Sequence, residues 1–484
     1  MSLVGHDPGP SPPEHHLHEP WPATLGHLQA TTRPASPAAS SLWSGDTSPV
    51  RETVQVQHIS RRAWLIWAAA VAAYLVAVLQ RTSLGVSGLE AAQRLEVSAA
   101  VLSTIAVVQL LVYVGMQIPV GVLVDRVGPR ALIAIGAALM AVGQVSMALA
   151  HSLPLALLAR LLVGAGDAMT WLSAIRLVAA WFPPRRVPLF TQLTAMTGQL
   201  GQILSAIPLL VLLHGPGWTP AFLSVASLSL MMAALSLFVL RDSPAGPAPR
   251  GSGRSWAEVR HSMGQTWRNP GTRLAFWTHA ITPFSPLMFL LLWGYPFLVS
   301  AQGLSRATAS ALFSLMAIVG IATSPVLGIV VSRHPLRRSW LVLGVVAATI
   351  AVWTVVLVLP GPAPLWLLVA LVVVLAIAGP TSVIAFDYAR TFNPPSNFGT
   401  ASGMANVGGF GASLITIFAV GLLLNLTGAG QSYSLAGFRV ALCSQYVVWA
   451  IGIAAFVRAS RRVRAQMAAE GAAAPATRDA LRPR

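Results

Sequence analysis

Long apolar runs alternate with short polar connections from residue 63 to residue 457. A helix of about 20 apolar residues crosses roughly 30 Å of hydrocarbon with its backbone hydrogen bonds closed internally. Every run reaches that length, so the pattern predicts twelve membrane-spanning helices. Their expected positions are 63–89, 98–122, 131–150, 154–181, 188–213, 219–240, 274–300, 307–331, 340–359, 365–389, 400–424 and 438–457.

The longest interruption divides these runs into two sets of six. We therefore predict an all-α membrane protein with six-helix bundles at 58–240 and 274–459, joined by a linker at 241–273. Residues 1–57 are rich in Pro, Ser, Gly and His without an apolar period, which is typical of a disordered tail. His15, His16 and His18 could bind a metal there, or they could simply be solvated. Residues 460–484 are expected to form a C-terminal tail.

The composition excludes several classes of protein. The chain is 55% hydrophobic and only 9% charged, whereas about 25% of residues are charged in soluble domains. Its net charge of +17 comes from Arg in short loops and tails, not from a basic face that could bind nucleic acid. No metal-ligand pair at helical spacing, nucleotide loop or Gly-x-Ser-x-Gly sequence appears, so we expect neither enzyme nor cofactor. Cys443, in the last run, is expected to be buried and excludes an internal disulfide.

The distribution of Arg predicts the orientation, because cationic residues concentrate in cytoplasmic loops. The even-numbered connections are rich in Arg: 126, 130, 185, 186, 241, 250, 254, 260, 268, 273, 333, 337 and 338. The odd-numbered connections hold only Arg94, Arg306 and Arg439. Both termini are therefore expected in the cytoplasm, with the protein in a bacterial inner membrane.

The two halves carry corresponding sequences. Gly121–Arg130 and Gly328–Arg337 are similar turns, each between two apolar runs. Aligning Pro183-Pro184 with Pro394-Pro395 also places Arg176 opposite Asp387, and Gly198 opposite Gly409. Parallel repeats of this kind are a transporter architecture.

These features resemble the major facilitator superfamily over nearly the whole chain past residue 57. The first turn is similar to that family's signature between helices two and three, and the second turn to its weaker copy, with Ser332 in place of the acid. Arg160, Gly164 and Gly166 resemble its fourth-helix motif. The signature positions are Gly121, Asp125, Arg126, Gly128 and Arg130, followed by Gly328, Arg333 and Arg337.

The resemblance implies a secondary active transporter that works by alternating access. Helix five lacks the Gly-Pro pair of the drug/proton antiporters. Tyr74 and Arg81 are similar to the organophosphate and anion-cation symporter branches, in which a helix-one Arg contacts the substrate anion. We favour a monomeric, proton-coupled importer of a small organic anion. An exporter of drugs or metabolites, and a transporter-like receptor or lipid-handling protein, are the alternatives.

Charged residues inside the membrane are costly and usually functional. Arg81 could contact an anion, because its forked guanidinium matches carboxylate and phosphate, or it could pair with Asp167; both roles are compatible. Arg160 precedes Asp167 by about two helical turns on the same face, roughly 10 Å away, so the three could form one cluster. Asp167 is a candidate for proton coupling, and a permanently ionised salt bridge is the alternative.

Other candidates lie nearby along the membrane spans. Gln109 and Tyr113 are expected at the substrate site with Tyr74 and Arg81. His279 could join them or act as hydrogen-bonded filler, and Gly379-Pro380 should weaken helix ten.

The gating predictions concern the cytoplasmic ends of the helices. Arg176 and Asp387, the latter also a proton-coupling candidate, are expected to pair across the halves as a gate formed only in the outward-open state, with Arg390 as the competing partner. We also expect Asp125 to accept from the first amides of helix three or from an Arg, and Arg126 and Arg130 to hold the neighbouring half.

Overall fold

The computed structural model describes residues 59–97, 99–206, 208–245, 256–427 and 434–479. Every regular element in these ranges is helical, which confirms the all-α prediction. The expected N-terminal tail, with His15, His16 and His18, lies outside the described residues, as do Arg250 and Arg254 of the linker.

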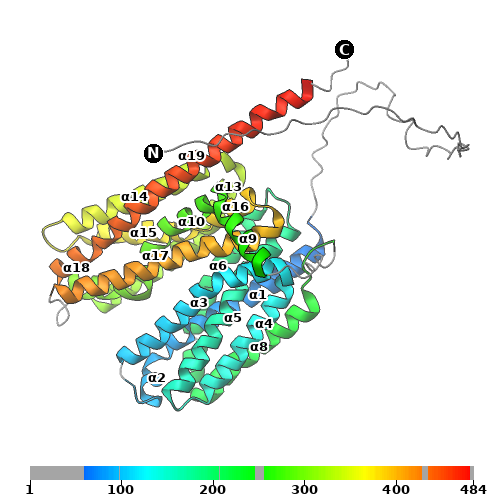
Figure 1. Cartoon of the computed structure of the whole chain (residues 1–484). Coiled ribbons are helices and arrows are strands. Elements are labelled where there is room, and N and C mark those ends of the chain that lie inside the picture. Colours follow the sequence, from blue (N-terminus) through cyan, green and yellow to red (C-terminus); the bar gives the residue numbers. More distant parts are fainter. Residues whose placement is uncertain (1–58, 98, 207, 246–255, 428–433, 480–484) are drawn as a thin grey trace, which may run out of the picture. The chain divides into compact units, whose positions relative to one another are not determined.

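The N-terminal half contains the first six expected spans. They correspond to α1 (Arg61–Val86), α3 (Ala99–Val127), α4 (Pro129–Ala148), α5 (Leu153–Trp181), α6 (Val187–Ala206) with α7 (Pro208–His214), and α8 (Trp218–Val239). The short helix α2 (Gly88–Arg94) connects the first two spans. In Figure 1 these helices, coloured blue to green, run alongside one another.

The C-terminal half repeats this series with more interruptions (Figure 1). Its seventh span is divided into α10 (Pro270–Ile281), α11 (Phe284–Met288), a π-helical turn (Phe289–Trp293), α12 (Gly294–Pro296) and a second π-helical turn (Phe297–Ala301). The remaining spans are α13 (Arg306–Arg333), α14 (Arg338–Val358), α15 (Leu365–Thr381) with α16 (Ile384–Phe392), α17 (Phe398–Leu426), and α18 (Leu435–Leu442) with α19 (Ser444–Asp479). The break between α15 and α16 follows Gly379-Pro380, where the sequence predicts a weak helix ten.

Helix starts follow local sequence signals. The hydroxyls of Ser60, Ser305 and Ser434 accept from the backbone amides of Ala63, Thr308 and Gly437 at 3.1, 3.1 and 3.2 Å. Such caps satisfy amides that have no partner inside the helix. Proline occupies the first position of α4 and α10, where its missing N–H costs no hydrogen bond.

Eleven segments in the described ranges are long and apolar enough to cross a membrane. The fifth expected span is not among them, because α6 carries Thr and Gln side chains along much of its length. It still packs against α1 and α13. Large apolar side chains such as Phe238 and Phe418 are exposed, as expected for helices that face lipid.

The structure adds helices to two predicted segments and corrects one residue. The linker contains the helix α9 (Trp256–Arg268), because its apolar positions fall on one helical face. The last helix continues to Asp479, through most of the expected C-terminal tail. Cys443 is exposed rather than buried, since it lies at the step between α18 and α19.

The two halves meet along two helix pairs, α3 with α17 and α6 with α13. A Cβ on Gly121 would lie only 2.5 Å from the carbonyl oxygen of Gly399, and one on Gly328 only 2.8 Å from the Cα of Leu189. The two corresponding glycines therefore allow the two pairs to approach closely. We call this side of the bundle, which carries the α3–α4 turn and α9, the linker end.

Candidate functional site

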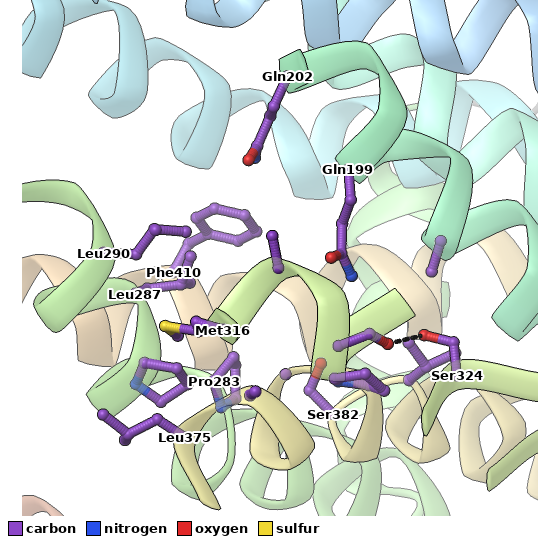
Figure 2. A pocket seen from close by; sticks show the side chains of 18 of the residues that line it. Gln199, Gln202, Pro283, Leu287, Leu290, Met316, Ser324, Leu375, Ser382 and Phe410 are labelled. Atoms are coloured by element: carbon purple, nitrogen blue, oxygen red, sulfur yellow. Dashed lines mark hydrogen bonds between the residues drawn. The ribbon is translucent and has the colours of Figure 1, made fainter. Parts of the chain in front are cut away.

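A cavity of about 260 Å³ lies between the two halves. Figure 2 shows Gln199 and Gln202 of α6 on one side of it, facing Met316, Ser382 and Phe410 on the other. The polar and aromatic residues of its wall are Tyr74, Arg81, Tyr113, Trp171, Gln199, Gln202, His279, Phe313, Ser324, Ser382, Phe386, Asn406 and Phe410. Each half contributes, so the cavity can contact one ligand from both sides.

Arg81 brings a positive charge to the wall of this cavity. Its Nε and Nη2 donate to Asp167 at 2.6 and 3.0 Å, and its guanidinium carbon lies 4.6 Å from the centre of the Tyr113 ring. The Asp167 side chain is 1% exposed, whereas 23% of the Arg81 side chain is exposed. The sequence left open whether Arg81 faces a ligand or pairs with Asp167, and the structure shows that it lines the cavity while paired.

Arg160 does not join this pair, contrary to the predicted three-residue cluster. It is fully buried and donates to the hydroxyl of Ser83 at 3.2 Å and the carbonyl of Gln80 at 3.5 Å. It also lies 6.0 Å from the ring of Phe222 in α8. Two turns of α5 separate it from Asp167, and its guanidinium bonds to α1 instead of the Asp167 carboxylate.

Three of the other predicted binding residues line the cavity and one does not. Tyr74 packs against Trp171 with ring centres 5.1 Å apart, and Tyr113 lies 4.9 Å from Phe410 of the other half. His279 also lines the cavity. Gln109 instead donates to the backbone carbonyl of Arg81 at 3.2 Å, so it supports the site from behind.

Corresponding glycines make room for two of these side chains. A Cβ on Gly198 would lie 3.0 Å from the ring of Tyr74, and a Cβ on Gly409 would overlap Nδ1 of His279. Tyr74 and His279 belong to the first helix of each half. In each half, therefore, a glycine at the corresponding position contacts an aromatic side chain of the first helix, on opposite sides of the cavity.

Sequence reasoning missed Gln199, Gln202 and Asn406. Asn406 donates to Gln117 at 2.7 Å and to the hydroxyl of Tyr113 at 3.3 Å, joining α17 to α3. The signal for these residues was an uncharged amide inside an apolar run, which is weaker than the signal of a charged residue there.

The expected pair between Arg176 and Asp387 is not formed in this structure. Asp387 accepts from Nη1 of Arg338, and from Arg390 at 2.6 Å, while Arg176 lies 6.0 Å from the ring of Phe398. The competing partner Arg390 is therefore engaged, and Arg338 from α14 adds a second contact that the sequence did not indicate.

Asp125 joins the two halves at the linker end. Its carboxylate accepts from the backbone amides of Gly399 and Thr400, both at 2.8 Å, and from the Thr400 hydroxyl at 2.9 Å. These amides belong to the first turn of α17, not to the following helix as predicted. One carboxylate from the N-terminal half thus caps a helix of the C-terminal half.

The rest of the first turn stabilises its own half. The backbone N–H of Arg130 donates to Asp242 at 2.9 Å, and its guanidinium reaches the carbonyl of Leu237, which corrects the expectation that it holds the other half. Gly128 has φ 94°, a conformation that favours glycine, and a Cβ there would lie 2.8 Å from the Asp242 carboxylate. Arg126 lies in the last turn of α3.

The second turn lacks an equivalent cap. The Ser332 hydroxyl donates to the carbonyl of Gly328 in its own helix at 2.7 Å, and Arg333 and Arg337 are exposed. In the fourth-helix motif, Gly164 permits close contact instead, because a Cβ there would lie 2.6 Å from the Gln109 carbonyl oxygen.

The fold and cavity define a multi-pass membrane protein with two similar six-helix halves around a central polar site. The sequence profile described as Major Facilitator Superfamily matches residues 66–417. The chain therefore belongs to the Major Facilitator Superfamily.

Curated relatives match part of the chain. It is 23% identical over 171 residues to a probable sulfoacetate transporter, SauU, of Cupriavidus necator. It is 27% identical over 187 residues to a probable L-galactonate transporter of Escherichia coli, and 29% over 180 residues to a candidate tartrate transporter of Agrobacterium vitis. These matches span 35–38% of this chain and 39–40% of the relatives.

Solved structures share the fold at low sequence identity. The proton:xylose symporter XylE, bound to 6-bromo-6-deoxy-D-glucose, has a TM-score of 0.61 and 15% identity, over 83% of this chain and 95% of that one. The Escherichia coli fucose:proton symporter FucP has a TM-score of 0.61 and 14% identity, over 83% and 99%.

Proposed function

We propose that this protein is a secondary active transporter that moves a small organic anion together with a proton by alternating access. One observation carries the proposal: a guanidinium faces the central cavity while a buried carboxylate holds it from behind. The curated relatives support the anion, because each is described as a transporter of an organic acid.

Arg81 is the residue that we assign to the anion. A guanidinium has five N–H donors, and the pair with Asp167 uses two of them. The pair and the Tyr113 ring fix the guanidinium before a ligand arrives, so little side-chain entropy is lost on binding. A carboxylate in the cavity can therefore form charge-assisted hydrogen bonds with the remaining donors.

Asp167 is the residue that we assign to the proton. An anion that draws Arg81 toward itself weakens the Arg81–Asp167 pair and leaves a buried carboxylate with less compensation, which favours protonation. Because coupling between two sites is reciprocal, a proton on Asp167 strengthens anion binding by the same factor. Asp387 is held by two Arg side chains, and we assign it a structural role.

The contacts between the halves support alternating access. Asp125 caps α17 at the linker end, where Gly121 and Gly328 also permit close packing. If the Arg-rich loops face the cytoplasm, the linker end is cytoplasmic and this structure is the conformation closed on that side. Opening must then break the Asp125 cap.

Flux measurements in proteoliposomes test the proposal. We expect an inward proton gradient to drive accumulation of labelled galactonate, with Arg81→Lys impaired and Arg81→Ala impaired more strongly, because Lys keeps the charge but loses the fork. Asp167→Asn should abolish accumulation driven by the gradient but retain exchange of anion for anion. Arg306→Gln, at an exposed position outside the signature turns and the cavity, is the control for loss of one positive charge.

Two outcomes would contradict the proposal. Binding of organic anions without flux would favour a receptor that lacks a transport cycle. Equal accumulation with and without a proton gradient would remove the proton from the mechanism.

A further inference from the structure

We infer that the cavity selects organic monoanions with an uncharged, hydroxylated body over dianions, and that one proton accompanies each anion so that net transport is electrically neutral. This inference rests on the proposed function and names the substrate class of the same site. It follows from which side chains of the cavity carry charge.

The cavity and the acid behind it contain a single pair of opposite charges. Among the described residues of the wall, the ionisable side chains are Tyr74, Arg81, Tyr113 and His279. Both tyrosines are neutral near pH 7. His279 lies 5.2 Å from the ring of Phe386 and 6.4 Å from that of Phe410, and no ion pair of His279 is formed in the described part of the chain. Burial between these rings disfavours a charged imidazole.

Charge balance then limits the ligand. Without ligand, Arg81 and ionised Asp167 sum to zero. With a monoanion on Arg81 and a proton on Asp167, the sum is again zero. A dianion would leave one negative charge with no cation to pair with it among the described residues of the wall, and a charge removed from bulk water is costly unless it is paired.

The uncharged polar wall suits hydroxyl groups. Gln199, Gln202 and Ser382 lie around the cavity in Figure 2, and amide side chains both donate and accept hydrogen bonds, as hydroxyls do. Tyr74 and Trp171 add aromatic surface for the carbon chain. A sugar acid, with one carboxylate and several hydroxyls, uses both features.

Transport of three probes at pH 7 tests the selection. Galactonate carries one negative charge, whereas tartrate and sulfoacetate carry two. We expect galactonate to be transported with a kcat/KM at least about tenfold higher than either dianion, which corresponds to about 1.4 kcal/mol. Equal or faster transport of tartrate would overturn the inference, while the proposed function would stand. Absence of flux for all three would contradict the proposed function itself.

Membrane potential provides an independent measurement on the unaltered protein. With potassium gradients and valinomycin setting the voltage, galactonate uptake driven by a fixed pH gradient should change less than about twofold per 100 mV, although moving one net charge through that potential is worth about 2.3 kcal/mol. Accumulation driven by the potential alone would show net charge movement and refute the neutral stoichiometry.

A charge added to the wall should reverse the selection. Gln199 is half-buried and faces the cavity (Figure 2), so Gln199→Lys supplies a second cation. We expect the ratio of tartrate to galactonate transport to rise about tenfold or more. Gln199→Met, similar in size but uncharged, should weaken galactonate transport without raising this ratio. An unchanged ratio in a Gln199→Lys protein that still transports galactonate would overturn the inference.

Discussion

Replacing Asp125 with Asn should shift the equilibrium between the two conformations of the transporter. In this structure the Asp125 carboxylate accepts two backbone N–H groups from the first turn of α17 and one hydroxyl. An Asn side chain keeps one acceptor oxygen and loses the negative charge. The closed linker end therefore loses part of its cap, while a conformation with a solvated Asp125 loses little.

The size of the shift follows from two contributions. A hydrogen bond to a charged group contributes about 1.5–3 kcal/mol, and a negative charge at a helix N-terminus adds about 0.3–1 kcal/mol. The amide oxygen of Asn retains part of this, because Asn and Asp are comparable as helix caps. We therefore expect a loss of about 1–2 kcal/mol, which is roughly a 5- to 30-fold change in the equilibrium constant.

Spin labels on the two halves provide the assay. Arg185 and Ser396 are exposed at the linker end, one in each half, and both can be replaced by Cys in a Cys443→Ser background. We expect the longer distances between the labels to gain population in Asp125→Asn. Asp242→Asn is the matched control, since Asp242 also caps a first-turn amide but within its own half. Its loss should lower stability without changing the distance distribution.

An unchanged distance distribution in a folded, inserted Asp125→Asn protein would contradict this prediction. The same shift in Asp242→Asn would also contradict it, because the effect would then be a general loss of stability rather than loss of a contact between the halves.

Three further predictions use matched pairs of positions. Gly409→Ala should strongly reduce substrate binding, because the new Cβ would overlap His279 Nδ1 in the cavity wall, whereas Gly411→Ala meets no atom within 4 Å and should bind normally in a ligand-binding assay. Arg338→Gln leaves the buried Asp387 carboxylate with Arg390 as its remaining ion-pair partner and should destabilise the protein by about 1–3 kcal/mol, seen as a lower Tm; its exposed neighbour Arg337→Gln should leave Tm within about a degree or two of wild type. In a cysteine-free background, Gly217→Cys should react with an impermeant thiol reagent in whole cells and Arg337→Cys should not; the reverse pattern would invert the proposed orientation.

Part of the candidate site could be predicted because charge inside a membrane is rare. Arg81 and Asp167 stand out in apolar runs, and their pairing was one of the two open interpretations. Gln199 and Asn406 did not stand out, because uncharged amides are common inside apolar runs. Such a residue indicates a binding site only once its contacts in the structure are known. The prediction for Arg160 was wrong because residues two turns apart on one helical face can contact different parts of the neighbouring helix, and Arg160 bonds to Gln80 and Ser83.

The predicted pair of Arg176 and Asp387 shows that a sequence repeat does not predict contacts between the two halves. The repeat places Arg176 and Asp387 at corresponding positions of spans four and ten, but correspondence between halves does not imply contact. Asp387 is held by Arg338 from the neighbouring α14 and by Arg390 from its own helix, and only the packing of α14 against the α15–α16 span provides the first of these.

The sequence by itself determined the membrane-spanning helices, the duplication and the two signature turns at Gly121–Arg130 and Gly328–Arg337. Each of these depends on local hydrophobicity or on the spacing of residues along the chain. Tertiary structure decided that Asp125 caps α17 more than 270 residues away, that Asp167 holds Arg81 from behind the cavity, and that Arg81 brings a positive charge to the cavity wall. These features depend on distances between helices. Such distances are set by close contacts at glycines such as Gly121 and Gly328, and a hydrophobic pattern along the chain does not record them.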